Sequence, residues 1–231
     1  SLRLRQDYLD GRGLVPGFAN PTYVSACNSA SVGTALERVR QLSAHEVGHT
    51  LGFPHNYLAS SYGRESVMDY PAPLIEITDD GEIDLSSAYL QRIGEYDKLS
   101  VRYAYEQFPP GANEEEELES IVQESIDRGL LFMAHNNNNF VGAGHQFASV
   151  WDNGDNLVDQ LKHEFEVRRI GMENFSPDLI REGEPYSNLE YVLLPLYMHH
   201  RFQLKSAAQS IGGANYRNAV RGDGQTPFTI I

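Results

Sequence analysis

The chain has 231 residues, of which 41% are hydrophobic and 22% charged, enough apolar material for one large domain or two small ones. Asp and Glu total 32 against 18 Lys and Arg, so the formal net charge is −14. This balance argues against nucleic acid or an anionic membrane surface as partner, because both attract basic patches; it also favours solubility. The sequence shows no signal peptide and no apolar stretch of transmembrane length.

The N-terminal part of the sequence predicts irregular chain followed by a helix. Glycine and proline recur through the first 30 residues, which leaves room for one short strand near residues 22–26. Thr34 and Glu37 fit the T-x-x-E pattern of a capping box. Apolar residues at helical spacing then predict a helix over residues 35–51, which Gly52 is placed to end in a left-handed cap.

A hairpin and a second helix are predicted next. In the stretch LIEITDDGEIDL, alternating apolar residues flank Asp80 and Gly81, the pair typical of a tight turn between two strands. Helical periodicity returns over residues 86–108. Two prolines and a glycine then break the chain, so we place a boundary there and divide the protein into residues 1–108 and 109–231.

The part after this boundary is predicted to be helical. Asn113 precedes four consecutive glutamates, which suit the first turn of a helix because the helix dipole favours negative charge there. A loop rich in glycine and asparagine over 135–156 separates it from helices near 156–175 and 188–210, the last kinked by Pro195. Strand signals are sparse, so the predicted fold class is mainly α with a few short strands; α+β is the alternative.

The stretch HEVGHTLGFPHN carries three histidines and a glutamate at intervals that suit a zinc site. His45 and His49 are four residues apart on the predicted helix, so they project from one face. Gly52 lets the chain reverse, which brings His55 to the same point from another direction. Three imidazoles and a water form the open tetrahedral arrangement of catalytic zinc. Glu46 points to an adjacent sector, where it can act as general base and then acid without binding the metal.

This spacing resembles the metzincin zinc signature H-E-x-x-H-x-x-G-x-x-H, filled here by His45, Glu46, His49, Gly52 and His55. The stretch SVMDY resembles the methionine turn of the same enzymes, in which Met68 would support the site from beneath. Tyr70 matches the position where astacin-like and serralysin-like members carry a tyrosine. The resemblance implies that Tyr70 is a fifth ligand at rest and a hydrogen-bond donor to the oxyanion during reaction.

The resemblance extends over residues 43–228, through segments such as IGEYDKLSVRYAY, LLPLYMHHRFQ and IGGANYRNAVRGDGQ. Together they are similar to a large bacterial family of exported zinc-dependent metalloproteases. This implies a metzincin-like zinc helix and methionine turn followed by a helical region, a peptide or protein substrate, and export to the periplasm or cell surface. Metzincins place a twisted sheet ahead of the zinc helix, and the 44 residues before His45 offer at most one short strand. We therefore expect the C-terminal portion of such an enzyme.

The sequence thus predicts a zinc-dependent endopeptidase that hydrolyses peptide bonds. The alternative is a non-catalytic zinc-containing scaffold or interaction module, in which residues 109–231 dock other domains or a partner protein. Glu46 favours the enzyme, because a purely structural zinc site has no use for a carboxylate at that position. A thermolysin-like hydrolase would need a downstream glutamate ligand in place of His55, so the sequence argues against it.

Other possible metal ligands carry weaker signals. The stretch HEFEV at 163–167 begins like the zinc motif but lacks the second histidine, so His163 is predicted to be a surface residue of a helix. His199 and His200 would diverge by about 100° on a helix, which favours a core or hydrogen-bonding role. The stretch DNGDN at 152–156 has enough oxygen ligands for calcium but lacks the closing acid of an EF-hand, and a turn with a helix cap is the alternative.

Overall fold

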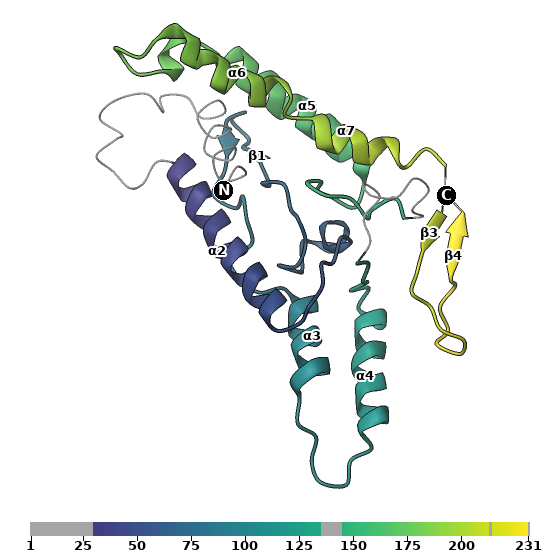
Figure 1. The fold of residues 1–231 in the computed structure, drawn as a ribbon. Helices are drawn as coiled ribbons and strands as arrows, with labels where there is room; N and C mark the ends of the chain where they lie inside the picture. The colour runs from purple at the N-terminus through teal and green to yellow at the C-terminus, as the bar shows by residue number, and fades with distance from the viewer. Residues whose placement is uncertain (1–29, 135–144, 213, 231) are drawn as a thin grey trace.

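The structure, a computed structural model, describes residues 30–134, 145–212 and 214–230, and it is mostly helical (Figure 1). Its α-helices are α2 (Ala30–Thr50), α3 (Glu95–Tyr105), α4 (Glu114–Asp127), α5 (Leu157–Glu173), α6 (Leu189–Tyr197) and α7 (Arg201–Ala208). Antiparallel pairing joins β1 (Glu76–Ile77) to β2 (Ile83–Asp84) and β3 (Ala214–Tyr216) to β4 (Phe228–Ile230). Short 3-10 turns are η2 (Ala59–Tyr62), η3 (Pro177–Leu179) and η4 (Tyr186–Asn188). The predicted mainly α fold class is confirmed.

Helix α2 carries the zinc motif and begins earlier than the sequence predicted. Thr34 and Glu37 lie inside the helix, so the predicted capping box is wrong. The carboxylate of Glu37 instead turns inward and accepts a hydrogen bond from the backbone N–H of Tyr89 at 3.3 Å. The predicted end is confirmed: the chain leaves the helix at Thr50, and Gly52 has a φ of +90°, the left-handed conformation that glycine adopts without strain.

Helix α3 is shorter than predicted because its N-terminus is fixed by the loop that it packs against. Residues 86–94 form turns and bends rather than helix. A Cβ on Gly94 would lie 1.9 Å from the carbonyl oxygen of Glu65, so only glycine allows this approach of two backbones. The carboxylate of Asp97 accepts hydrogen bonds from the N–H groups of Gly94 and Val67, each at 2.8 Å. These contacts set the start of α3 at Glu95.

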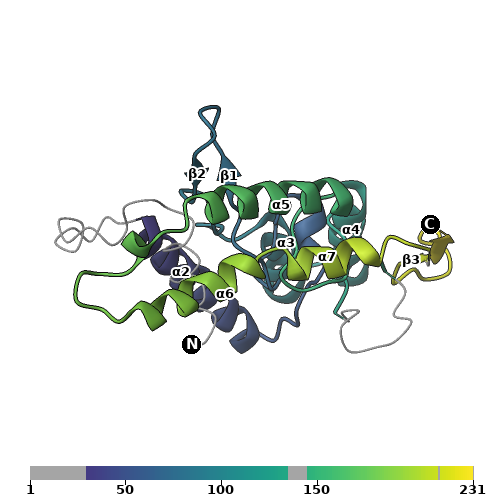
Figure 2. The same ribbon diagram turned by 90° about the horizontal axis from the view of Figure 1, so that it is seen from above.

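The C-terminal helices form a layer in which α5 packs against α6 and α7 (Figure 2). Asn156 caps α5, as the sequence predicted: its side chain accepts hydrogen bonds from the backbone N–H groups of Val158 and Asp159. The single helix predicted over 188–210 is in fact two helices, α6 and α7. At the break between them, the His199 ring lies 2.7 Å from the buried carboxylate of Glu164 in α5. The sequence pattern favoured one continuous helix; in the structure the helix is interrupted where His199 contacts Glu164 of α5.

Three buried apolar clusters connect elements that are distant in the sequence. The first contains Ile75, Leu85, Val167 and Leu196, the second Tyr57, Leu58, Met133 and Ala148, and the third Leu99, Ile121 and Leu130. The third cluster packs α3 against α4, and the predicted boundary between residues 108 and 109 falls in the connection between these two helices. Each cluster therefore draws on both sides of that boundary, and the division into two domains stays a prediction.

Both hairpins bear on the sequence predictions. The β1–β2 hairpin is confirmed, with Gly81 in the turn at a φ of +80°. The β3–β4 hairpin was not predicted, because its strands are short and their residues stay largely exposed. The strand expected near 22–26 lies outside the described residues. None of the described helices combines the length and the apolar character that crossing a bilayer requires.

The close backbone contact at Gly94 predicts a large loss of stability on substitution. We expect Gly94→Ala to lower the free energy of unfolding by about 3 kcal/mol, because the added methyl group would overlap the Glu65 carbonyl. Urea denaturation measures the change. Gly33→Ala is the matched control: its Cβ would meet no described atom within 4 Å inside α2, and we expect it to stabilise by about 0.5 kcal/mol. Equal effects of the two substitutions would contradict this account.

Candidate metal centre

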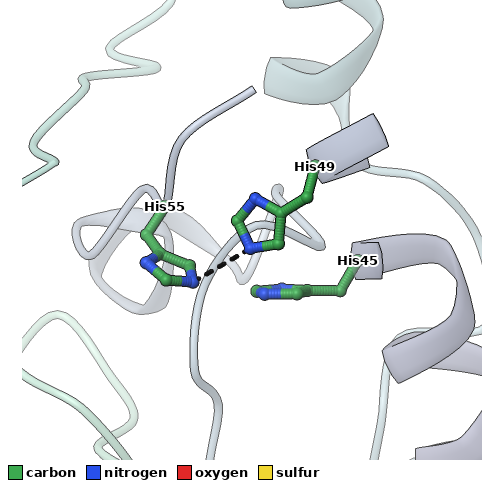
Figure 3. Close-up of side chains that lie close together, drawn as sticks. All are labelled: His45, His49 and His55. Carbon is green, nitrogen blue, oxygen red and sulfur yellow. Dashed lines mark hydrogen bonds between the residues drawn. The ribbon is translucent and has the colours of Figure 1, made fainter. Parts of the chain in front are cut away.

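Three histidines converge beside the C-terminal half of α2. His45 and His49 project from the helix, and His55 comes from the loop that follows it (Figure 3). One ring nitrogen from each lies within 4.8 Å of the others, and the Nε2 atoms of His49 and His55 are 3.1 Å apart. In the described parts of the chain this is the one group of three or more His, Cys, Asp or Glu side chains placed to share a metal ion.

Each of these rings has its Nδ1 atom at hydrogen-bond distance from an oxygen. The partners are the Val67 carbonyl for His45 (2.7 Å), the Phe53 carbonyl for His49 (2.8 Å) and the Tyr57 phenol for His55 (3.0 Å). A carbonyl oxygen only accepts, so the proton of His45 and of His49 is assigned to Nδ1. This leaves Nε2 with a lone pair, the arrangement in which an imidazole binds zinc with its other nitrogen held by a neighbour. The donor set fits zinc.

Burial favours the neutral form of His45 and His55, the form that metal binding requires. Desolvation lowers the pKa of His45, and it lowers the pKa of His55 to about 4, with the neighbouring His45 and His49 rings adding to the effect on His55. An imidazole that stays uncharged at neutral pH has its lone pair available for a cation. The site is therefore prepared for a metal ion rather than for an anion.

The methionine turn lies against α2 and orients the first ligand. Met68 is buried, and a Cβ on Gly48 would lie 2.3 Å from its sulfur atom, so a glycine at position 48 lets the helix rest on the methionine. The carbonyl oxygen of Met68 accepts a hydrogen bond from the backbone N–H of Asn56 at 3.0 Å. The neighbouring carbonyl of Val67 is the oxygen bonded to His45. Helix, turn and third-ligand loop thus form one hydrogen-bonded unit.

A family model described as Met-zincin matches residues 29–231. The chain belongs to the Met-zincin family. No curated protein and no solved structure matches the chain. Family and histidine cluster together make this a zinc metallopeptidase-type domain, as the resemblance implied.

The other two predicted site residues of this Met-zincin lie beside the histidines. Glu46 follows the first ligand on α2 with an exposed side chain, and its negative charge acts to raise the pKa of both His45 and His55. The Tyr70 ring packs on two ligands, with centroids 5.4 Å from His45 and 4.5 Å from His55. The Tyr70 ring therefore borders the histidine cluster, and Glu46 is the neighbour of its first ligand on α2.

The remaining histidines considered from the sequence lie away from this centre, in the α5–α7 layer. His163 is half-buried rather than on the surface, and its Nε2 lies 2.6 Å from the Ile75 carbonyl. His199 pairs with Glu164, and the His200 ring packs against Phe165. These contacts are structural, which agrees with the hydrogen-bonding or core role predicted for His199 and His200.

The stretch considered for calcium is split between interior and solvent. Asp152 and Asn153 are buried, whereas Asp155 and Asn156 are exposed and Asn156 caps α5. Among the described residues, no group of three or more His, Cys, Asp or Glu side chains placed to share an ion includes this stretch. The turn and helix cap account for these residues, and calcium has no support.

Sequence reasoning missed Asn56, the residue directly after the third histidine. Its side chain is fully buried and makes four hydrogen bonds. The amide nitrogen donates to the Tyr62 phenol and the Leu131 carbonyl, and the amide oxygen accepts the N–H groups of Leu58 and Met133. A polar side chain directly after the zinc motif was the only signal in the sequence. Its partners lie up to 77 residues away and could not be read from it.

Two carboxyl groups are buried near each other, Asp69 in the methionine turn and Asp152 in the loop before α5. Asp69 accepts the backbone N–H groups of Ser60 (3.0 Å) and Tyr70 (2.7 Å), and burial still raises its pKa to about 7. Burial raises the pKa of Asp152 well above the ordinary value, and the negative charge of Asp69 adds to the shift. A carboxyl whose pKa is raised on folding binds its proton more tightly in the folded state, so its contribution to stability is lost as the pH rises.

We therefore expect Asp152→Asn to raise the free energy of unfolding at pH 8, because the amide removes an ionisation that burial opposes. The gain over the wild type should shrink as the pH is lowered towards 3.8, the unperturbed pKa of an aspartate. At that pH Asp152 of the wild type is increasingly protonated in the unfolded state as well as in the folded state. Urea denaturation at several pH values measures the difference. Asp155→Asn, at an exposed position of the same turn, is the control and should show no such trend. A gain that grows towards acid pH would refute the assignment.

Proposed function

We propose that this Met-zincin is a zinc-dependent endopeptidase whose metal is held by the Nε2 atoms of His45, His49 and His55. The observation that carries the proposal is the shared arrangement of these rings, each with Nδ1 at hydrogen-bond distance from an oxygen. Three imidazole ligands leave a coordination position open, which separates catalytic from structural zinc sites. Zinc bound there would polarise the scissile carbonyl and lower the pKa of the attacking water to about 7.

Glu46 is the proposed general base. Its position next to the first ligand, on an exposed part of α2, supports a carboxylate that reaches the attacking water without binding the metal. It accepts the proton of that water and then delivers it to the leaving amine. Tyr70 is the proposed oxyanion donor, because its ring already packs on His45 and His55 and its phenol can hydrogen-bond to the substrate oxygen.

One observation favours the alternative, a non-catalytic zinc module that binds a partner. Helix α2 and the turn that directly follows it expose an apolar stripe made of Leu36, Val39, Val47 and Leu51. Apolar side chains gathered on one face mark surfaces that another domain or protein covers. A module of this kind would keep the zinc but would have no need of Glu46, so substitution at that position separates the two functions.

The enzyme hypothesis predicts that Glu46→Gln abolishes cleavage and leaves zinc bound. We expect peptide hydrolysis to fall by at least about 10³-fold, because the amide cannot accept the proton. Zinc content should remain near one ion per chain by elemental analysis, since Glu46 is not a ligand. His49→Ala is the control that should lose both zinc and cleavage. Cleavage retained by purified Glu46→Gln protein would refute the role, and a wild type that binds zinc without cleaving peptides would favour the module.

Tyr70→Phe tests the oxyanion role. Removing one donor to the developing charge is expected to lower kcat by about 10²-fold and to change KM little, because the interaction forms in the transition state. Steady-state kinetics on a peptide that the wild type cleaves give both constants. An unchanged kcat would exclude the phenol from the reaction.

We further propose that the protein acts outside the cytoplasm, in the periplasm or at the cell surface. The support is the resemblance of the chain to exported bacterial metalloproteases. Fractionation of cells that make the natural protein, followed by detection with an antibody against this chain, tests the proposal. Recovery only in the cytoplasmic fraction would refute it.

A further inference from the structure

The third ligand differs from the other two in what holds it. The Nδ1 atoms of His45 and His49 face main-chain carbonyls, which no substitution at the carbonyl residue removes. The Nδ1 atom of His55 faces a side chain, the phenol of Tyr57, at 3.0 Å. His55 is also the one ligand of the three that lies outside α2, so no helix backbone fixes its position.

Tyr57 is itself held in place by chain from beyond residue 108. Its backbone N–H donates to the Met133 carbonyl at 2.9 Å, and its side chain is buried in the cluster that contains Met133 and Ala148. The neighbouring Asn56 bonds to the carbonyl of Leu131 and to the N–H of Met133. The loop that carries the third ligand is therefore held to Leu131 and Met133 by one main-chain hydrogen bond and by the side chain of Asn56.

We propose that Tyr57 is a positioning residue for the metal, an inference that rests on the proposed zinc site. When the metal occupies Nε2 of His55, the proton of the ring lies on Nδ1 and is donated to the phenol oxygen of Tyr57, and this contact keeps the ring from turning about its Cβ–Cγ bond. An oxygen acceptor on Nδ1 also makes the ligating nitrogen a stronger base. The ring contact between the two residues, with centroids 5.3 Å apart, holds the phenol against the imidazole.

This assignment gives the chain after residue 108 a role in the metal centre. Met133 holds the backbone of Tyr57, and the phenol of Tyr57 contacts the His55 ring. The position of residues 131–133 therefore affects the position of His55. A shift of that segment would move the third ligand and leave the two ligands on α2 in place. The downstream region thus sets the geometry of the site, in addition to any partner that it binds.

The test is the zinc affinity of Tyr57→Phe, which removes one oxygen atom and keeps the ring. Competition with a chromophoric chelator should show zinc binding weakened by about 10- to 100-fold. In protein loaded with cobalt(II), the visible absorption bands should also change in position or intensity, because they report the geometry around the ion. A loss of packing alone would not alter those bands. Circular dichroism of the metal-free protein checks that the variant folds.

Tyr62→Phe is the matched control. The Tyr62 phenol donates to the Leu131 carbonyl at 2.9 Å and accepts the Asn56 amide N–H at 2.7 Å, but within the described structure no hydrogen bond or ring contact joins it to a ligand histidine. We expect its zinc affinity and cobalt spectrum to match the wild type. The inference is overturned if Tyr57→Phe binds zinc within twofold of the wild type, if both variants lose affinity equally, or if the wild type binds no zinc. A wild type that binds zinc but cleaves no peptide would remove the proposed activity alone.

Discussion

The metal centre depends on one buried carboxylate, that of Asp97 at the start of α3. It accepts the backbone N–H groups of Val67 and Gly94 and the hydroxyl of Ser66, so it joins the methionine turn to the helix. The carbonyl of the same Val67 is bonded to Nδ1 of His45. Burial raises the pKa of Asp97, and the three hydrogen bonds act in the opposite direction by favouring its charged form. The orientation of the first ligand therefore rests on a contact between residues 30 positions apart.

The third ligand depends on a second set of long-range contacts, through Asn56 and Tyr57 to residues 131–133. The parts of the chain before and after the predicted boundary at residues 108 and 109 are thus joined where the metal would bind. A third connection runs from the Tyr70 carbonyl, which accepts the backbone N–H of Trp151. Helix α2 supplies two ligands by its own periodicity, and the rest of the described structure places the remaining groups around them.

The chemistry of the site favours an enzyme over a structural zinc module for a physical reason. A structural site is closed by four protein ligands, whereas the described cluster offers three imidazoles with an acid and a phenol beside them. The exposed apolar stripe on α2 is compatible with both functions, because a catalytic domain can also cover it with another part of its protein. The two functions differ in the need for Glu46.

The sequence by itself determined the ligand set. The spacing of His45 and His49 places both on one helix face, and Gly52 turns the chain towards His55, so these are local consequences of helix geometry and of a left-handed glycine. The β1–β2 hairpin and the cap of α5 followed in the same way from adjacent residues.

Only the tertiary structure decided the inward turn of the Glu37 side chain, the division of the last predicted helix into α6 and α7, and the segment that holds the loop of the third ligand. Each depends on residues far apart in the chain: Glu37 with Tyr89, Glu164 with His199, and Asn56 with Met133. Local propensity and spacing carry no information about such pairs, because they form only when packing brings distant segments together.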